Sequence, residues 1–266
     1  MPLTYSTPTA TGGAAPITVT CTPATGAMFP SGASTVTCTA IDGAGRSATC
    51  GFSVSVNAIP RLSRTRFLTF GDSLTEGKIS LTLTSLVDSP AHSYPAKLLR
   101  LLTDRYTGQT LTVINEGLGG ERADESFSRL ARAISQHRPE AVLLMHGVND
   151  LNGTHDGRVQ LAADAMEELV KEVRNRGGVA FAATLPPLGP GGKAGCPECV
   201  QPYNNLVRRM AAAKGATLVD VHAAWGGRAG LMGADGIHPT EAGYEVIATA
   251  FFEAIRRTLE SPAQKR

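Results

Sequence analysis

Two widely separated stretches of the chain hold the residue types that nucleophilic catalysis by a serine requires. Ser73 follows the apolar run 67–70 and Gly71, and Asp235 and His238 lie together near the other end of the sequence. A serine hydroxyl is a poor nucleophile until a base takes its proton, and His238 is the candidate base. A carboxylate three residues before His238 can reach back to the imidazole, fix its tautomer and stabilise the imidazolium. We therefore consider Ser73, Asp235 and His238 a candidate catalytic triad.

Two glycine-containing segments offer hydrogen-bond donors for the oxyanion of a tetrahedral intermediate. Gly120 ends the segment 115–120, and Asn149 lies within the segment 147–150. A glycine N–H and an asparagine amide suit this task, because neither adds charge or takes the proton. Taken alone, each segment more often forms only a turn. Their occurrence together with the candidate triad favours the catalytic interpretation.

The elements that must position these residues begin at Arg66, where strand-like and helix-like runs alternate. The strand-like runs are 66–70, 111–115, 141–145, 178–183 and 217–221, and the helix-like runs are 95–106, 124–137, 158–176, 200–214 and 240–259. This alternation predicts a doubly wound parallel sheet. Such a sheet has its active crevice outside the carboxyl ends of its strands. Because the candidate residues follow a strand or lie just before the last helix, we expect them to meet there.

With these residues in place, the sequence from 66 to about 260 resembles the SGNH hydrolases, also called the GDSL esterase/lipase family. The resemblance rests on four motifs in the family's order, which are Gly71-Asp72-Ser73-Leu74, Gly120, Gly147-Val148-Asn149-Asp150 and Asp235-Gly236-Ile237-His238-Pro239. It implies a three-layer α/β/α sandwich of flavodoxin-like type with a five-stranded parallel sheet and no metal or cofactor. It also implies Ser73 as nucleophile, His238 as base, Asp235 as its orienting partner, and an oxyanion hole made by the Ser73 N–H, the Gly120 N–H and the Asn149 side chain. The rival serine-hydrolase elbow, G-x-S-x-G, fits poorly because Thr75 stands at its last glycine.

The predicted function is hydrolysis of carboxylic esters with short- to medium-chain acyl groups through an acyl-enzyme. Acetylated polysaccharides, lysophospholipids and thioesters are alternative substrates, since acyl preference depends on loops such as 78–92 and 185–199. An alternative of another class is a cell-surface binding or adhesion protein with an incidental hydrolase domain.

Residues 1–57 differ in composition, being rich in Thr, Ala, Gly, Ser and Pro with short β-type runs at 17–21, 34–40 and 48–56. The last two runs flank the turn 42–46, which is typical of a hairpin. The segment resembles the later part of a HYR (hyalin repeat) domain, an immunoglobulin-like β-sandwich, and is short for a complete one. We expect a small all-β module at 1–57, a linker at 58–65, the hydrolase domain at 66–260 and a tail at 261–266. The module is either a binding module or a spacer.

The five cysteines leave at least one thiol free unless it pairs between chains. Cys38–Cys50 is one candidate bridge across the hairpin, but Cys21 can displace either partner. For Cys196 and Cys199 we favour a small loop disulfide over free thiols, because no second pair follows at zinc-site spacing. This cysteine usage favours an oxidising compartment, so we expect an extracellular, periplasmic or cell-surface protein.

The net charge and the hydropathy of the sequence limit the classes of partner that we expect. The net charge is +2 with no Lys/Arg-rich block, so we expect no nucleic-acid partner, and no apolar run is long enough for a membrane helix. The start of the sequence carries no signal-peptide pattern. The expected partner is a small-molecule or polysaccharide ester. Among other polar residues, we expect His146 to pack beneath the site and Asp72 and Asp150 to hold local turns.

Overall fold

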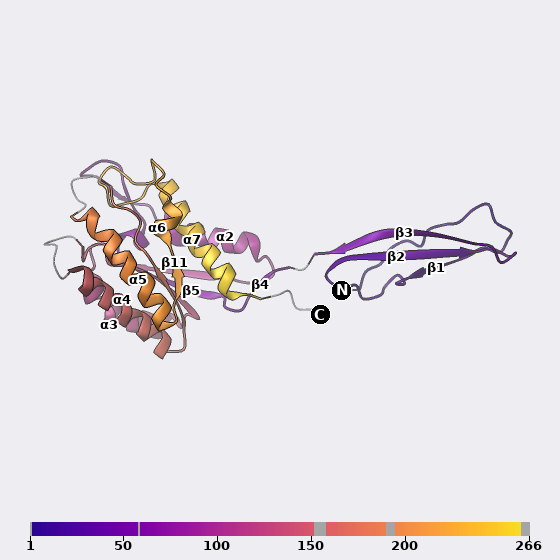
Figure 1. Cartoon of the computed structure of the whole chain (residues 1–266), viewed down its shortest axis with the longest axis horizontal. Coiled ribbons are helices and arrows are strands. Elements are labelled where there is room, and N and C mark those ends of the chain that lie inside the picture. Colours follow the sequence, from indigo (N-terminus) through magenta and orange to yellow (C-terminus); the bar gives the residue numbers. More distant parts are fainter. Residues whose placement is uncertain (1, 58, 152–157, 190–194, 262–266) are drawn as a thin grey trace. The chain divides into compact units, whose positions relative to one another are not determined.

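The computed structural model describes residues 2–57, 59–151, 158–189 and 195–261. The chain divides into two compact units, one formed by Met1–Pro60 with Ser261–Arg266 and the other by Arg61–Glu260 (Figure 1). The domain boundaries predicted from the sequence stay a prediction. Within the predicted linker, Leu62 is buried in the core of the larger unit, and the Ser63 N–H donates to the Leu259 carbonyl over 2.8 Å.

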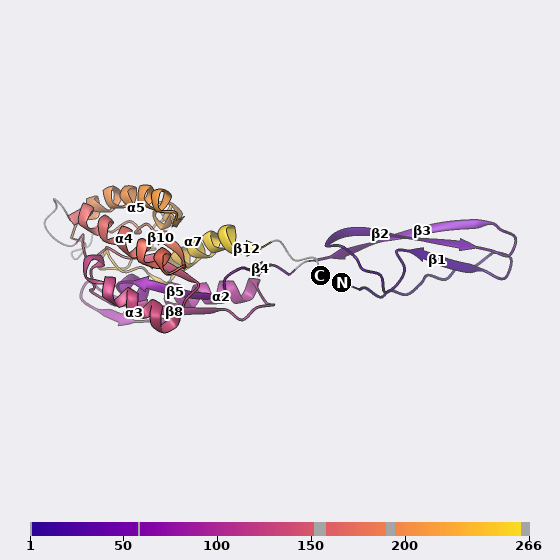
Figure 2. The same cartoon turned by 90° about the horizontal axis from the view of Figure 1, so that it is seen from below.

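The smaller unit contains a three-stranded antiparallel sheet in the order β1-β2-β3, built from β1 (Thr18–Thr22), β2 (Gly32–Ile41) and β3 (Ser47–Val56). The strands run alongside one another in both views (Figures 1 and 2). The predicted hairpin joins β2 to β3, and the Asp42 carboxylate stabilises its turn by accepting the N–H groups of Ala44 and Arg46. Val36 and Phe29 are buried in a small core of this unit, which confirms the small all-β module.

The register of this sheet brings three cysteines next to one another. Cys38 on β2 lies opposite Cys21 on β1 and also opposite Cys50 on β3. The disulfide joins Cys21 to Cys38, whose Cα atoms are only 4.0 Å apart, and Cys50 is free and exposed. A distance this short is typical of a non-hydrogen-bonded antiparallel pair, in which the side chains approach most closely. The candidate bridge Cys38–Cys50 is therefore wrong, whereas the predicted bridge Cys196–Cys199 is present.

The larger unit is organised around a five-stranded parallel sheet in the order β11-β10-β9-β5-β8. Its strands are β5 (Arg66–Gly71), β8 (Thr112–Gly117), β9 (Ala141–Met145), β10 (Val179–Ala183) and β11 (Thr217–Val219). All residues of β9 and all but the first of β5 are buried, as expected for central strands covered on both faces. The predicted sheet is confirmed, and β5 lies between β8 and β9.

Helices cover both faces of this sheet. They are α1 (Ser73–Glu76), α2 (Tyr94–Arg105), α3 (Phe127–His137), α4 (Arg158–Asn175), α5 (Val200–Lys214), α6 (Val221–Trp225) and α7 (Glu241–Leu259), with single-turn helices η1 (Pro90–His92), η2 (Ala123–Glu125) and η3 (Pro197–Cys199). On one face α2 packs against α7, and on the other α3, α4 and α5 pack in a row (Figure 1). The arrangement confirms the predicted α/β/α sandwich.

Four further short strands lie outside the parallel sheet. A hairpin of β6 (Lys78–Ser80) and β7 (Leu86–Asp88) follows α1, and β4 (Arg61–Leu62) pairs with β12 (Glu260–Ser261). The predicted last strand, 217–221, ends early at Val219, because Asp220 caps α6 by accepting the Ala223 N–H. Within the predicted loop 185–199, residues 190–194 lie outside the described residues.

Candidate active site

Ser73 lies at the point where the central strand β5 turns into the short helix α1. Gly71 is required there, since a Cβ at this position would collide with the Met145 carbonyl of the neighbouring strand. The Asp72 side chain caps α1 by accepting the Leu74 N–H over 3.0 Å. The sharp, capped turn therefore holds the Ser73 side chain at the carboxyl end of the sheet.

His238 and Asp235 complete a hydrogen-bonded chain with Ser73. His238 Nε2 lies 2.8 Å from Ser73 Oγ, and His238 Nδ1 lies 2.6 Å from Asp235 Oδ2. All three residues are buried. Burial raises the pKa of the Asp235 carboxyl, but hydrogen bonds from the His238 backbone and ring and from the Ile237 N–H outweigh it and leave the pKa below its usual value. Asp235 is thus held as a carboxylate against the imidazole.

The loop that carries Asp235 and His238 is tied down at several points. The Asp235 N–H donates to Ser80 Oγ over 3.0 Å, and the Gly233 N–H donates to the His238 carbonyl over 2.8 Å. After His238, Thr240 caps α7 by accepting the Gly243 N–H. This cap fixes the start of α7 directly after His238, so the imidazole is held by a segment anchored at both ends.

The two further oxyanion candidates lie on the loops that follow the strands on either side of β5. Gly120 follows β8 and has a φ of +80°, which favours glycine. Asn149 follows β9, and its Nδ2 donates to the Glu121 carbonyl over 2.9 Å. Among the described residues, neither the Ser73 N–H nor the Gly120 N–H has a hydrogen-bond acceptor. These N–H groups and the second Asn149 amide hydrogen remain candidate donors.

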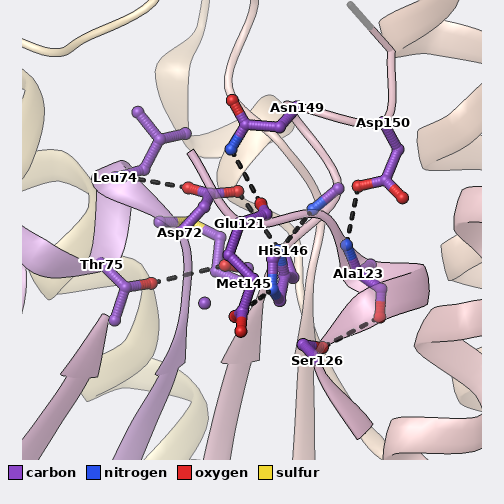
Figure 3. Close-up of polar contacts among 12 residues, drawn as sticks. Asp72, Leu74, Thr75, Glu121, Ala123, Ser126, Met145, His146, Asn149 and Asp150 are labelled. Carbon is purple, nitrogen blue, oxygen red and sulfur yellow. Dashed lines mark hydrogen bonds and ion pairs between the residues drawn. The ribbon is translucent and has the colours of Figure 1, made fainter. Parts of the chain in front are cut away.

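Asp150 does not hold a local turn, contrary to the sequence-based expectation. Its carboxylate, which is buried, accepts the N–H groups of Ala123 and Asp124 over 2.8 and 3.4 Å, and so caps η2 from another loop (Figure 3). Burial raises the pKa of Asp150 despite these bonds. The partnership joins the Asn149 loop to the segment that follows Gly120, which the spacing of the residues in the sequence does not reveal.

His146, expected only to pack beneath the site, lies between two carboxylates (Figure 3). Its Nε2 is 3.2 Å from Glu121 Oε2, its Nδ1 is 3.4 Å from Asp72 Oδ2, and the side chain is fully buried. Glu121 also pairs with Arg129 of α3. Neither Glu121 nor Arg129 belongs to a motif of the sequence that indicates a role in the site. Only the position of Glu121, directly after Gly120, offers a signal in the sequence.

Two family models match the chain. The model of the GDSL-like Lipase/Acylhydrolase family matches residues 69–246, and that of the HYR domain matches residues 1–56. A multidomain esterase from Ruminococcus flavefaciens is 28% identical over 162 residues, which cover 59% of this chain and 21% of the relative. The chain thus spans only about a fifth of the length of this curated relative.

Solved structures similar to the larger unit share its fold. A putative arylesterase from Agrobacterium tumefaciens has a TM-score of 0.61 at 26% identity, covering 73% of this chain and 99% of that one. An acetylxylan esterase from Geobacillus stearothermophilus has a TM-score of 0.59 at 20% identity, covering 73% and 94%. The second likeness shows the fold alone. None of the helices that the structure describes is long and apolar enough to cross a membrane.

Proposed function

Because the chain belongs to the GDSL-like lipase/acylhydrolase family, we propose that its larger unit hydrolyses carboxylic esters through an acyl-enzyme on Ser73. The family predicted from the four sequence motifs is confirmed, and with it the class of enzyme, a carboxylic-ester hydrolase. The proposed roles of these residues rest on the two short contacts that link Ser73 Oγ to His238 and His238 to Asp235.

The mechanism follows from that chain. His238 Nε2 takes the proton of Ser73 Oγ while the oxygen attacks the ester carbonyl, and Asp235 stabilises the imidazolium that forms. The tetrahedral intermediate collapses when Nε2 gives this proton to the leaving alkoxide, so that an alcohol departs and the acyl group stays on Ser73. A water molecule then attacks the acyl-enzyme with His238 again as base. The products are a carboxylic acid and the free serine.

Three donors serve the oxyanion in this proposal. The Ser73 and Gly120 N–H groups are free of acceptors among the described residues, which supports their role. The Asn149 amide has one hydrogen engaged by the Glu121 carbonyl, which orients the group and leaves the other hydrogen for the substrate. Donors fixed before reaction stabilise the developing charge without reorganisation.

We propose short- to medium-chain acyl esters as substrates and acetylated polysaccharides as the second candidate. The second is supported by the HYR-type module that precedes the hydrolase unit. The same module and the disulfides Cys21–Cys38 and Cys196–Cys199 support an extracellular, periplasmic or cell-surface location. Lysophospholipids, thioesters and a binding role with incidental hydrolysis are outcomes that the following experiment separates.

The test is a panel of chromogenic esters from acetyl to long acyl, with acetylated xylan, a lysophospholipid and a thioester beside it. An optimum at short to medium chains supports the proposal, acetylated xylan as best substrate supports the second candidate, and a preference for long acyl chains contradicts both. Ser73→Ala should lower kcat by several orders of magnitude in a folded protein. Failure of the wild type to turn over any ester would favour the binding role.

A further inference from the structure

Three loops carry the hydrogen-bond donors proposed for the oxyanion, and His146 contacts all three loops. We call them the donor loops: 71–73, which begins at the last residue of β5, 117–121, which begins at the last residue of β8, and 146–150, which follows β9. His146 is fully buried, a costly place for an ionisable ring unless it is paired. It belongs to the third donor loop and faces a carboxylate from each of the other two (Figure 3). Its ring is therefore in contact with all three.

The two nitrogens of the ring have different surroundings. Nε2 lies 3.2 Å from Glu121 Oε2, so it carries a hydrogen in either protonation state. Nδ1 lies 3.4 Å from Asp72 Oδ2 and 3.0 Å from the Gly147 N–H. With no proton, Nδ1 accepts the Gly147 N–H and turns its lone pair toward Asp72. With a proton, it donates toward that carboxylate instead.

The charges around the ring favour the state in which Nδ1 carries a proton. Asp72 Oδ2 is buried and has no hydrogen-bond partner within the described part of the chain unless Nδ1 carries a proton. An unpaired buried carboxylate oxygen costs more than an unpaired backbone N–H. Arg129 pairs with Glu121 and with Glu116, whereas among the described residues no lysine or arginine pairs with Asp72. A protonated His146 supplies the positive charge that faces Asp72.

The charged groups that face this ring favour the state with a proton on both nitrogens. Burial lowers the pKa of His146, but the facing carboxylates of Asp72 and Glu121 outweigh it and raise the pKa to about 9. The buried Asp150 carboxyl, from the third donor loop, adds a favourable charge interaction. The edge of Phe70 from β5 contacts the ring as well, and it carries no charge. From α5, the Tyr203 hydroxyl donates to the His146 carbonyl over 2.8 Å.

We propose that His146 is a positioning residue that carries a proton on both ring nitrogens and bridges the Asp72 and Glu121 carboxylates. Through these two contacts it fixes the spacing of the three donor loops. This inference rests on the proposed function, because it assigns His146 a task in the same reaction. The ring itself does not touch the triad in the described contacts.

Asp72 and Glu121 each lie next to groups that the proposed reaction uses. Asp72 precedes Ser73 and caps its helix. Glu121 follows Gly120, and its carbonyl accepts the Asn149 amide. The Arg129 guanidinium that pairs with Glu121 also donates to the Gly71 carbonyl over 3.1 Å. Loss of the bridging proton leaves two neighbouring carboxylates with one cation, so the donors lose their alignment.

The experiment compares kcat and KM of the wild type and His146→Gln between pH 5 and 10.5, with His222→Gln of α6 as the matched control. Glutamine keeps hydrogen-bonding groups but carries no proton-dependent charge. We expect kcat of His146→Gln at pH 7.5 to fall on the order of 10- to 100-fold with KM nearly unchanged, less than the loss of an oxyanion donor itself. In the wild type and the control, kcat should decline above about pH 9, and this alkaline decline should be absent in His146→Gln.

Two measurements keep the inference testable if His146→Gln does not fold. The histidine-ring ¹⁵N spectrum of the wild type should show His146 as an imidazolium at pH 7.5. In Glu121→Gln, which removes one facing carboxylate, the alkaline decline should begin at lower pH. A neutral His146 at pH 7.5, a wild-type kcat in His146→Gln, or an alkaline decline that neither variant alters would overturn the inference. An inactive wild type contradicts the proposed function instead, and the ring spectrum still reports on the proton.

Discussion

Replacing Asp235 by asparagine tests the triad with little change of shape. In the wild type, Asp235 Oδ1 accepts the N–H groups of Ile237 and His238 over 3.1 and 3.0 Å, and Oδ2 faces His238 Nδ1. The asparagine carbonyl should keep the two backbone bonds, which directs its NH₂ group at Nδ1. Because an NH₂ group donates, Nδ1 must then accept, and the ring proton moves to Nε2.

A proton on Nε2 faces Ser73 Oγ across 2.8 Å, so the imidazole can no longer take the serine proton. The buried carboxylate that stabilises the imidazolium is lost as well. A wrong tautomer of this kind costs about 10⁴ in kcat in a serine triad. Since each tenfold is about 1.4 kcal/mol of activation free energy, the expected loss is roughly 5 kcal/mol.

The assay measures kcat and KM on the best ester of the panel together with the thermal midpoint. We expect kcat to fall by about 10³–10⁴, KM to stay within a few-fold and the midpoint to move little. Asp104→Asn, at an exposed position near the end of α2, is the control and should behave as wild type. A kcat of Asp235→Asn within about tenfold of wild type in a folded protein would refute the assigned role of Asp235.

The remaining predictions concern the oxyanion hole and the stability of the folded protein. Asn149→Ala should lower kcat by about 10²–10³, while Asn205→Ala on α5 should not, and equal activities of the two would contradict the oxyanion role of Asn149. Because the pKa of His146 rises on folding to about 9, its stabilising effect is complete below its unfolded pKa near 6.5 and is lost as the pH rises through 9. Denaturant unfolding at pH 6 and pH 10 should differ by roughly 3 kcal/mol more in wild type than in His146→Gln.

The parts of the site that the sequence revealed depend on local patterns. Asp235 and His238 lie three residues apart, and the Gly71 turn follows directly on a buried strand, so their chemistry is readable from neighbours in the chain. The order of strands and helices was readable for the same reason. Each strand of the sheet contains a short apolar run, and each long helix has its own continuous pattern of apolar and polar residues.

The parts that stayed hidden depend on pairings between distant residues. Cys38 lies opposite a cysteine on each neighbouring strand, and only the local geometry of the sheet selects Cys21. The Asp150 carboxylate caps a turn on another loop, which no turn preference at its own position indicates. The partners of His146 come from loops after two other strands, and the residues next to His146 in the sequence give no sign of them.

The most direct test of the central claim is covalent labelling of the wild type with a fluorophosphonate, read by intact mass and peptide mapping. We expect one adduct per chain on Ser73, loss of esterase activity in proportion to labelling, and no adduct in Ser73→Ala. An active protein that resists the label, or one labelled and inactivated at another residue, would contradict Ser73 as the nucleophile.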